Sequence, residues 1–171
     1  MKKLNALLLS SCVLALTACA NQGSNAPKSE NSPQAATKAA SGATACRSIG
    51  EGRKVRQSDK NDGYMCKASV ALNSAEAKEV LSPNIRVSYG STSGQTNVSR
   101  QIANAVGKTP DETCQRAFLN AVKRFQSTAT RYKKNSVRLV SYFDKKTIGG
   151  SEYECHIGTW NSRVVLKGSF H

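Results

Sequence analysis

The residues of this chain best suited to chemistry are four cysteines that follow its apolar beginning, Cys46, Cys66, Cys114 and Cys155. Thiols can pair as disulfides, bind a metal ion or act as nucleophiles. A zinc site is poorly supported, because no CxxC pair is present and the only histidines are His156 and His171. A catalytic thiol would leave one of an even number of cysteines without a partner. In an oxidising compartment we therefore predict two disulfides, for which three pairings exist.

A second group of reactive side chains, Glu152, Glu154 and His156, recurs at every second residue. In a strand this spacing places all three on one face, with Asp144 in the preceding turn, where such a row could bind a cation or transfer protons. A solvated outer face of a sheet explains the same pattern. Cys155 would point away from its neighbour His156, so the dipeptide cannot form a Cys–His dyad. We expect no enzymatic activity, no metal ion and no cofactor.

The beginning of the sequence resembles the signal peptide of bacterial lipoproteins. Lys2 and Lys3 form a positive segment, and the apolar run of residues 4–16 is too short to span a bilayer. The stretch Leu16-Thr17-Ala18-Cys19 matches a lipobox at each position. In that class of protein Cys19 becomes the first residue and carries a diacylglycerol thioether and acyl chains such as palmitate. The alternative is an ordinary secretory signal, in which Cys19 has no special role.

This resemblance implies a location and a division of the chain. Residues 1–18 would be the signal peptide, which removes Cys12, and residues 19–44 the lipidated cysteine and a tether. Ala20 follows Cys19, where an aspartate would favour the inner membrane, so we expect a lipid-anchored protein of the outer membrane that faces the periplasm. Residues 20–44 contain no Val, Ile, Leu or aromatic side chain and therefore cannot bury enough apolar surface to become ordered. A flexible tether of this length reaches about 30 Å on average.

The chain is strongly basic, and removal of Lys2 and Lys3 lowers its net charge from +14 to +12. This charge favours anionic partners, namely lipopolysaccharide, phospholipid headgroups, peptidoglycan, acidic protein surfaces or nucleic acid. The candidate contacts are basic side chains in two stretches, Arg53, Lys54, Arg56, Lys60, Lys123, Arg124, Arg131, Lys133 and Lys134. Nucleic acid is less favoured, because these stretches lack aromatic residues that would stack on bases. A solvated surface explains the same charge.

Residues 45–171 are expected to form a single domain. Its first segment, between Cys46 and Cys66, is polar and basic and predicts a loop closed by a disulfide. A two-turn helix is predicted over residues 74–81, because Asn73 or Ser74 can cap it. Alternating apolar residues predict a strand over residues 85–89 and a further strand within residues 96–105.

The clearest predicted element is a helix over residues 110–133. Thr109 can cap it, and Pro110 is favoured at its first position. One apolar stripe recurs at helical spacing and is expected to face the core, Cys114, Phe118, Ala121, Val122, Phe125, Ala129 and Tyr132.

Three strands should follow, over residues 137–143, 152–157 and 160–170. The order of elements predicts an α+β fold, a mainly antiparallel sheet with the long helix on one face. Cys114 on the helix stripe and Cys155 on an inward strand face are well placed to meet. The favoured pairing is therefore Cys114–Cys155 with Cys46–Cys66.

Residues 74–170 resemble a family of small exported bacterial proteins that carry the label excinuclease ATPase subunit. The matching motifs are Thr113-Cys114-Gln115-Arg116-Ala117-Phe118-Leu119, Ser141-Tyr142-Phe143, Glu152-Tyr153-Glu154-Cys155 and Val164-Val165-Leu166-Lys167-Gly168. The ATPase label has no support, because neither Gly90–Gly94 nor Gly149-Gly150 continues as a phosphate-binding loop. The layout also resembles, more remotely, YbjQ-like proteins and the RcsF type of disulfide-bonded outer-membrane lipoprotein, which senses envelope damage.

The leading interpretation is a non-enzymatic, lipid-anchored module of the cell envelope that binds another envelope component or senses stress. The alternative is a binder of nucleic acid or of another anionic polymer, such as lipopolysaccharide or peptidoglycan, through its basic surface. A structural lipoprotein within a larger assembly is a third reading, which the sequence does not separate from the first.

Overall fold

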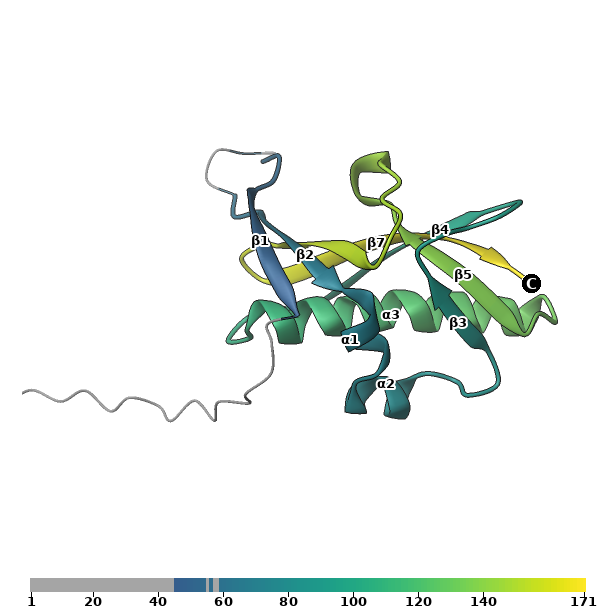
Figure 1. Ribbon diagram of the computed structural model, residues 1–171. Coiled ribbons are helices and arrows are strands. Elements are labelled where there is room, and N and C mark those ends of the chain that lie inside the picture. The colour runs from purple at the N-terminus through teal and green to yellow at the C-terminus, as the bar shows by residue number, and fades with distance from the viewer. Residues whose placement is uncertain (1–44, 55, 57–58) are drawn as a thin grey trace, which may run out of the picture. The chain divides into compact units, whose positions relative to one another are not determined.

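The computed structural model describes residues 45–54, 56 and 59–171 (Figure 1). The predicted signal peptide, Cys19 and the tether lie outside the described residues. The helices and strands are β1 (Cys46–Glu51), β2 (Asp62–Lys67), α1 (Ala68–Leu72), α2 (Ala75–Val80), β3 (Arg86–Tyr89), β4 (Asn97–Asn104), α3 (Pro110–Arg131), β5 (Ser136–Ser141), the short 3-10 helix η1 (Phe143–Lys145), β6 (Glu152–Ile157) and β7 (Asn161–Phe170). Within this part of the chain no helix is both long and apolar enough to cross a membrane.

The described strands form one seven-stranded sheet. Six of them follow the order β1-β2-β6-β7-β5-β3, and β4 pairs with β7 outside this order. β3 pairs with β5 in parallel, and the other pairs are antiparallel. The long helix α3 runs along one face of this sheet (Figure 1). The predicted α+β fold, a mainly antiparallel sheet covered by one long helix, is confirmed.

Helix α3 begins as its sequence predicts. The Thr109 hydroxyl accepts a hydrogen bond from the Glu112 backbone N–H, while the Glu112 carboxylate accepts one from the Thr109 backbone N–H, which completes a capping box. The bond from the Thr109 backbone lowers the pKa of Glu112 from its ordinary value. The predicted apolar stripe is buried except at Tyr132, which follows the last helical residue and is 55% exposed. Tyr132 stacks edge-on against Phe170 at the rim of the core.

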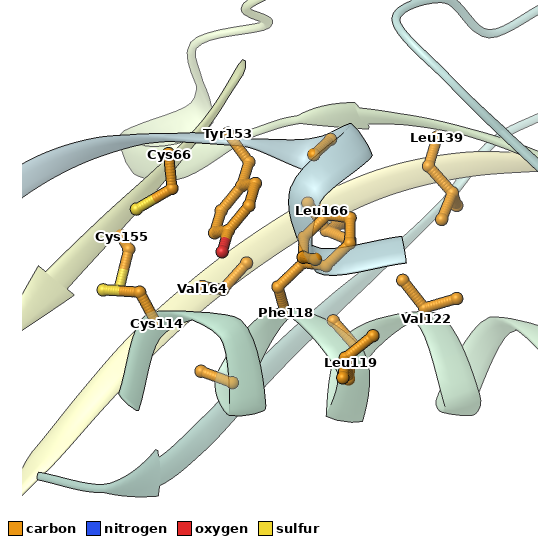
Figure 2. Close-up of a cluster of buried hydrophobic side chains, with 14 of the residues drawn as sticks. Cys66, Cys114, Phe118, Leu119, Val122, Leu139, Tyr153, Cys155, Val164 and Leu166 are labelled. Atoms are coloured by element: carbon orange, nitrogen blue, oxygen red, sulfur yellow. A yellow bond between two sulfur atoms is a disulfide. The ribbon is translucent and has the colours of Figure 1, made fainter. Parts of the chain in front are cut away.

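The main core lies between α3 and the sheet (Figure 2). Phe118 of α3 and Tyr153 of β6 stack with ring centroids 4.2 Å apart. Helix and sheet approach closely at Gly168, where a Cβ atom would lie 2.4 Å from a Leu139 methyl carbon and 2.8 Å from the Phe125 ring. Only glycine fits at this position of β7 without displacing its neighbours.

The two disulfides are Cys46–Cys66 and Cys114–Cys155, which confirms the favoured pairing. The segment between the first pair is not simply a loop, because β1 and β2 form an antiparallel ladder in which Cys46 lies opposite Cys66. Strand β1 has little signature in the sequence, since it is an edge strand whose residues after Cys46 are all exposed. The short helix α1 was also missed, because its five residues are fewer than a periodic pattern needs.

Candidate functional site

The face of the sheet opposite α3 is partly covered, which corrects the expectation of a solvated face at His156. The connection after β5 folds back over this face, and the Phe143 ring stacks on the imidazole with centroids 3.9 Å apart and planes inclined by 7°. His156 is consequently only 5% exposed. Met65, Val140 and Val165 are buried on the same face, and together with Phe143 they form a second, smaller apolar cluster.

Both ring nitrogens of His156 are engaged in hydrogen bonds. Nε2 lies 2.7 Å from the Glu154 carboxylate, and Nδ1 lies 3.0 Å from the side-chain oxygen of Asn61. The Asn61 side-chain nitrogen donates in turn to the Arg53 carbonyl, 2.7 Å away, which fixes the orientation of the amide. An oxygen atom therefore faces each nitrogen of the ring. His156 thus fastens the β1–β2 connection to the sheet.

The contact between this connection and His156 is close. The Gly52 backbone passes so near that a Cβ atom on it would lie 2.3 Å from the His156 ring. The Gly52 N–H also donates to the Asn61 carbonyl at 2.7 Å. Any larger residue at position 52 would push the connection away from the sheet.

A pocket of about 450 Å³ opens on this face, between the β1–β2 connection and the turn that joins β6 to β7. Its described lining includes four cationic side chains and one carboxylate, namely Arg53, Lys54, Lys60, Arg163 and Asp59. Two large apolar side chains stand at its rim. Ile102 of β4 is 54% exposed and Trp160 of the turn is 70% exposed. The pocket therefore combines an excess of positive charge with exposed apolar surface.

Two of the four cations have a carboxylate partner. The Lys54 ammonium lies 2.8 Å from Glu51, and the Lys60 ammonium lies 3.3 Å from Asp62. Both ion pairs are exposed to solvent, so each carboxylate interacts only weakly with its ammonium group.

The two arginines, Arg53 and Arg163, form no ion pair with any described residue. The Arg163 guanidinium lies over the Phe143 ring, 5.1 Å from its centroid. Burial, reinforced by the charge of Arg100 and opposed by that of Asp144, lowers the pKa of Arg163 from its ordinary value. Desolvated guanidinium groups favour binding of a carboxylate or phosphate, with which they can form paired hydrogen bonds.

The basic residues singled out in the sequence do not form one surface. Arg53 and Lys54 line the pocket, as does Lys60, and Arg56 is exposed in the same connection. The remaining five are exposed on α3 or just after it, Lys123, Arg124, Arg131, Lys133 and Lys134. Because α3 packs on the opposite face of the sheet, these five lie away from the pocket (Figure 1).

Several residues of the pocket escaped sequence reasoning, among them Ile102, Trp160 and Arg163. Their positions in separate strands and a turn hide their proximity, which pairing of β4 and β6 with β7 creates. One signal was available, because Trp160 stands in a polar turn between Thr159 and Asn161, where burial cannot explain a tryptophan.

The described residues contain no cluster of side chains suited to binding a metal ion. The one group of three potential ligands with neighbouring ligand atoms comprises Cys46, Cys66 and Cys114, which are all in disulfides. Glu152, Glu154, His156 and Asp144 do not converge in this way. No protein-family model, curated protein or solved structure matches the chain, so the resemblances named above remain predictions.

Proposed function

We propose that this chain is a lipid-anchored, non-catalytic binding module of the bacterial outer membrane, and that its pocket holds an anionic component of the envelope. The observation that carries the proposal is the presence beside the exposed Trp160 of two arginines, Arg53 and Arg163, that pair with no carboxylate in the part of the chain that the structure describes. The lipobox-like Leu16-Thr17-Ala18-Cys19 and the polar segment that follows support the anchor and its tether.

The chemistry of the described side chains supports a binding role over catalysis. Both nitrogens of His156 are held by Asn61 and Glu154, so the ring has no free nitrogen with which to accept a proton from a ligand. The four cysteines are in disulfides and offer no thiolate. A sensor role suits the same pocket, because a ligand that contacts Arg53 would act on a connection that His156 ties to the sheet through Asn61.

A long anionic polymer is the weaker candidate. A polymer that followed all the predicted basic residues would have to contact both faces of the sheet, since Arg53 lies on one side and Arg131 on the other. The separation favours a compact anionic group in the pocket, such as a phosphate of lipopolysaccharide.

The anchor can be tested directly. The full chain expressed in a bacterial host should be recovered in the outer-membrane fraction, and its mature mass should include a diacylglyceryl group and a further acyl chain on Cys19. The variant Cys19→Ser should be released into the soluble periplasmic fraction. An unmodified amino terminus and a soluble wild-type protein would refute the anchor while leaving the pocket untested by this assay.

The pocket is tested by photocrosslinking in intact cells. A photoreactive amino acid placed at Thr159, on the rim, should yield adducts with lipopolysaccharide, whereas one at the exposed Ser127 of α3 should not. The variant Arg53→Glu should reduce the yield of adducts at Thr159 by at least about tenfold, which corresponds to loss of a charged contact. The matched change Arg86→Glu, on the exposed end of β3, should leave the yield unchanged. An adduct yield that does not respond to Arg53→Glu would contradict the proposed site.

A further inference from the structure

Strand β4 has one long open edge. Ala105, at the end of β4, donates to the Trp160 carbonyl, so residues of odd number along β4 pair with β7 and the backbone groups of Val98, Arg100 and Ile102 point away from it. The Ile102 carbonyl accepts a hydrogen bond from Asn120 of α3. Among the described residues nothing occupies the backbone N–H and C=O groups of Val98 and Arg100. An open edge of this kind can accept another strand.

The side chains on this part of β4 do not protect it. Val98 and Ile102 are 55% and 54% exposed, and they flank Arg100 on one face of the strand. Neither proline nor a bulge interrupts β4, which pairs with β7 in one continuous register. Natural edge strands that avoid partners carry such features. The edge is therefore suited to strand addition, and Val98 and Ile102 would contact alternate side chains of the added segment.

The surroundings of the open edge are positively charged. Between β4 and the second half of α3 lies a groove of about 270 Å³, whose described lining contains Arg124 and Arg131 of α3 and no acidic residue; Arg100 borders the groove, with its side chain on the other face of β4 beside Val98. Phe125 and Phe170 contribute apolar surface to the same groove. A strand added beside β4 would place every second side chain toward this groove.

Charge complementarity selects the occupant. A second copy of this chain would bring a second Arg100 against the first, and β4 itself contains no acidic residue. An extended segment with acidic side chains at alternate positions would instead meet the arginines of the groove while its backbone pairs with Val98 and Arg100. We propose that β4 is a docking edge for an extended acidic segment of a protein partner, a site that adjoins the pocket at Trp160 through Ile102.

The proposal can be tested with synthetic peptides and the full chain purified in detergent. A fluorescent peptide of about eight residues that alternates valine and glutamate has the length of an ordinary strand. It should bind with saturation and slow hydrogen exchange at the amides of Val98, Arg100 and Ile102. A valine–lysine peptide should not bind. A proline–glutamate peptide of equal charge should not bind either, because with its glutamates toward the groove the prolines occupy the positions whose N–H groups would face β4.

Variants of β4 distinguish backbone pairing from simple attraction of charge. Val98→Pro removes an N–H that does not pair with β7, so the sheet should fold while affinity for the valine–glutamate peptide falls by about tenfold or more. Val98→Ala keeps the N–H and should change affinity by less than about threefold.

A pair of changes on α3, Arg124→Glu with Arg131→Glu, keeps the test independent of the folding of β4 and should also weaken binding by about tenfold or more. Equal binding of the proline–glutamate peptide would overturn the proposal. Dimers in sedimentation that Val98→Pro dissociates would overturn it as well, because a second copy would then occupy the edge.

Discussion

His156 and Phe143 lie in parallel contact on the face of the sheet that α3 leaves uncovered, with ring centroids 3.9 Å apart. Phe143 belongs to the connection after β5, whereas His156 reaches the β1–β2 connection through Asn61. The stack therefore joins two connections that are far apart in the sequence, and one of them carries Arg53 into the pocket.

The variant His156→Ala should destabilise the protein and loosen the pocket. It removes the stack on Phe143 and the hydrogen bonds to Asn61 and Glu154, so the free energy of unfolding should fall by about 2–4 kcal/mol in denaturant titrations. Trypsin should also cut after Arg53 faster than in the wild type. The variant His171→Ala, at an exposed position, should cause neither effect. Equal trypsin rates for the two variants would contradict the role assigned to His156.

The variant Gln126→Ala should detach the segment between α2 and β3. The buried Gln126 side chain donates to the carbonyls of Ser82 and Ile85 and accepts from the Ser82 N–H. Its loss leaves three backbone groups without partners, and we expect the free energy of unfolding to fall by about 2–3 kcal/mol. Gln101→Ala removes a single side-chain contact, to Ser99, and should cost less than about 1 kcal/mol. Thermal unfolding that ranks these two variants in the opposite order would count against this account.

Alkaline pH should unfold the protein through two tyrosines. Burial raises the pKa of Tyr89 and Tyr153 far above the ordinary value of about 10. The folded state keeps both phenols neutral, so their contribution to stability is complete below about pH 10 and is lost as the pH rises above that value. Phenolate absorbance of these two residues should appear together with loss of circular dichroism. Ionisation of all tyrosines before unfolding would show that the two phenols are accessible.

The two disulfides should contribute unequally. Cys114–Cys155 closes a separation of 41 residues and joins α3 to β6, whereas Cys46–Cys66 closes 20. On the chain-entropy relation, replacing both members by alanine should cost about 4 kcal/mol for the first pair and about 3 kcal/mol for the second. Guanidinium unfolding of the two double variants measures the difference. A greater loss for the Cys46–Cys66 variant would point to native contacts of β1 that exceed the entropic effect.

The sequence predicted elements whose signals are local. Thr109, Pro110 and Glu112 define the start of α3, and the stripe from Cys114 to Ala129 defines its buried face, so both the helix and the partner of Cys155 could be inferred. β1 was missed because an exposed edge strand needs no alternation of polar and apolar residues.

The candidate site was less predictable, because local patterns do not report contacts between distant segments. His156 was expected to be solvated, because alternation within β6 shows which side chains share a face but not whether a distant segment covers that face. The cover comes from Phe143, which simple alternation along a strand over residues 137–143 would place on the same face as Val137. A residue with positive φ, Asp144, follows Phe143 and turns the chain back over the sheet. Such a turn depends on tertiary packing that single-sequence patterns do not report.

The central position of β7 also constrains how the domain can be made. β7 is the last strand in chain order, and it pairs with β4, β5 and β6. The sheet cannot be completed before residues 161–170 are available, because β7 joins β1-β2-β6 to the pair β5-β3 and is the partner of β4. The domain should therefore stay unfolded during synthesis and acquire its structure late, in one step dominated by contacts between distant residues. For the exported protein proposed above, such delay would be an advantage, because premature folding would block passage of the extended chain through a membrane.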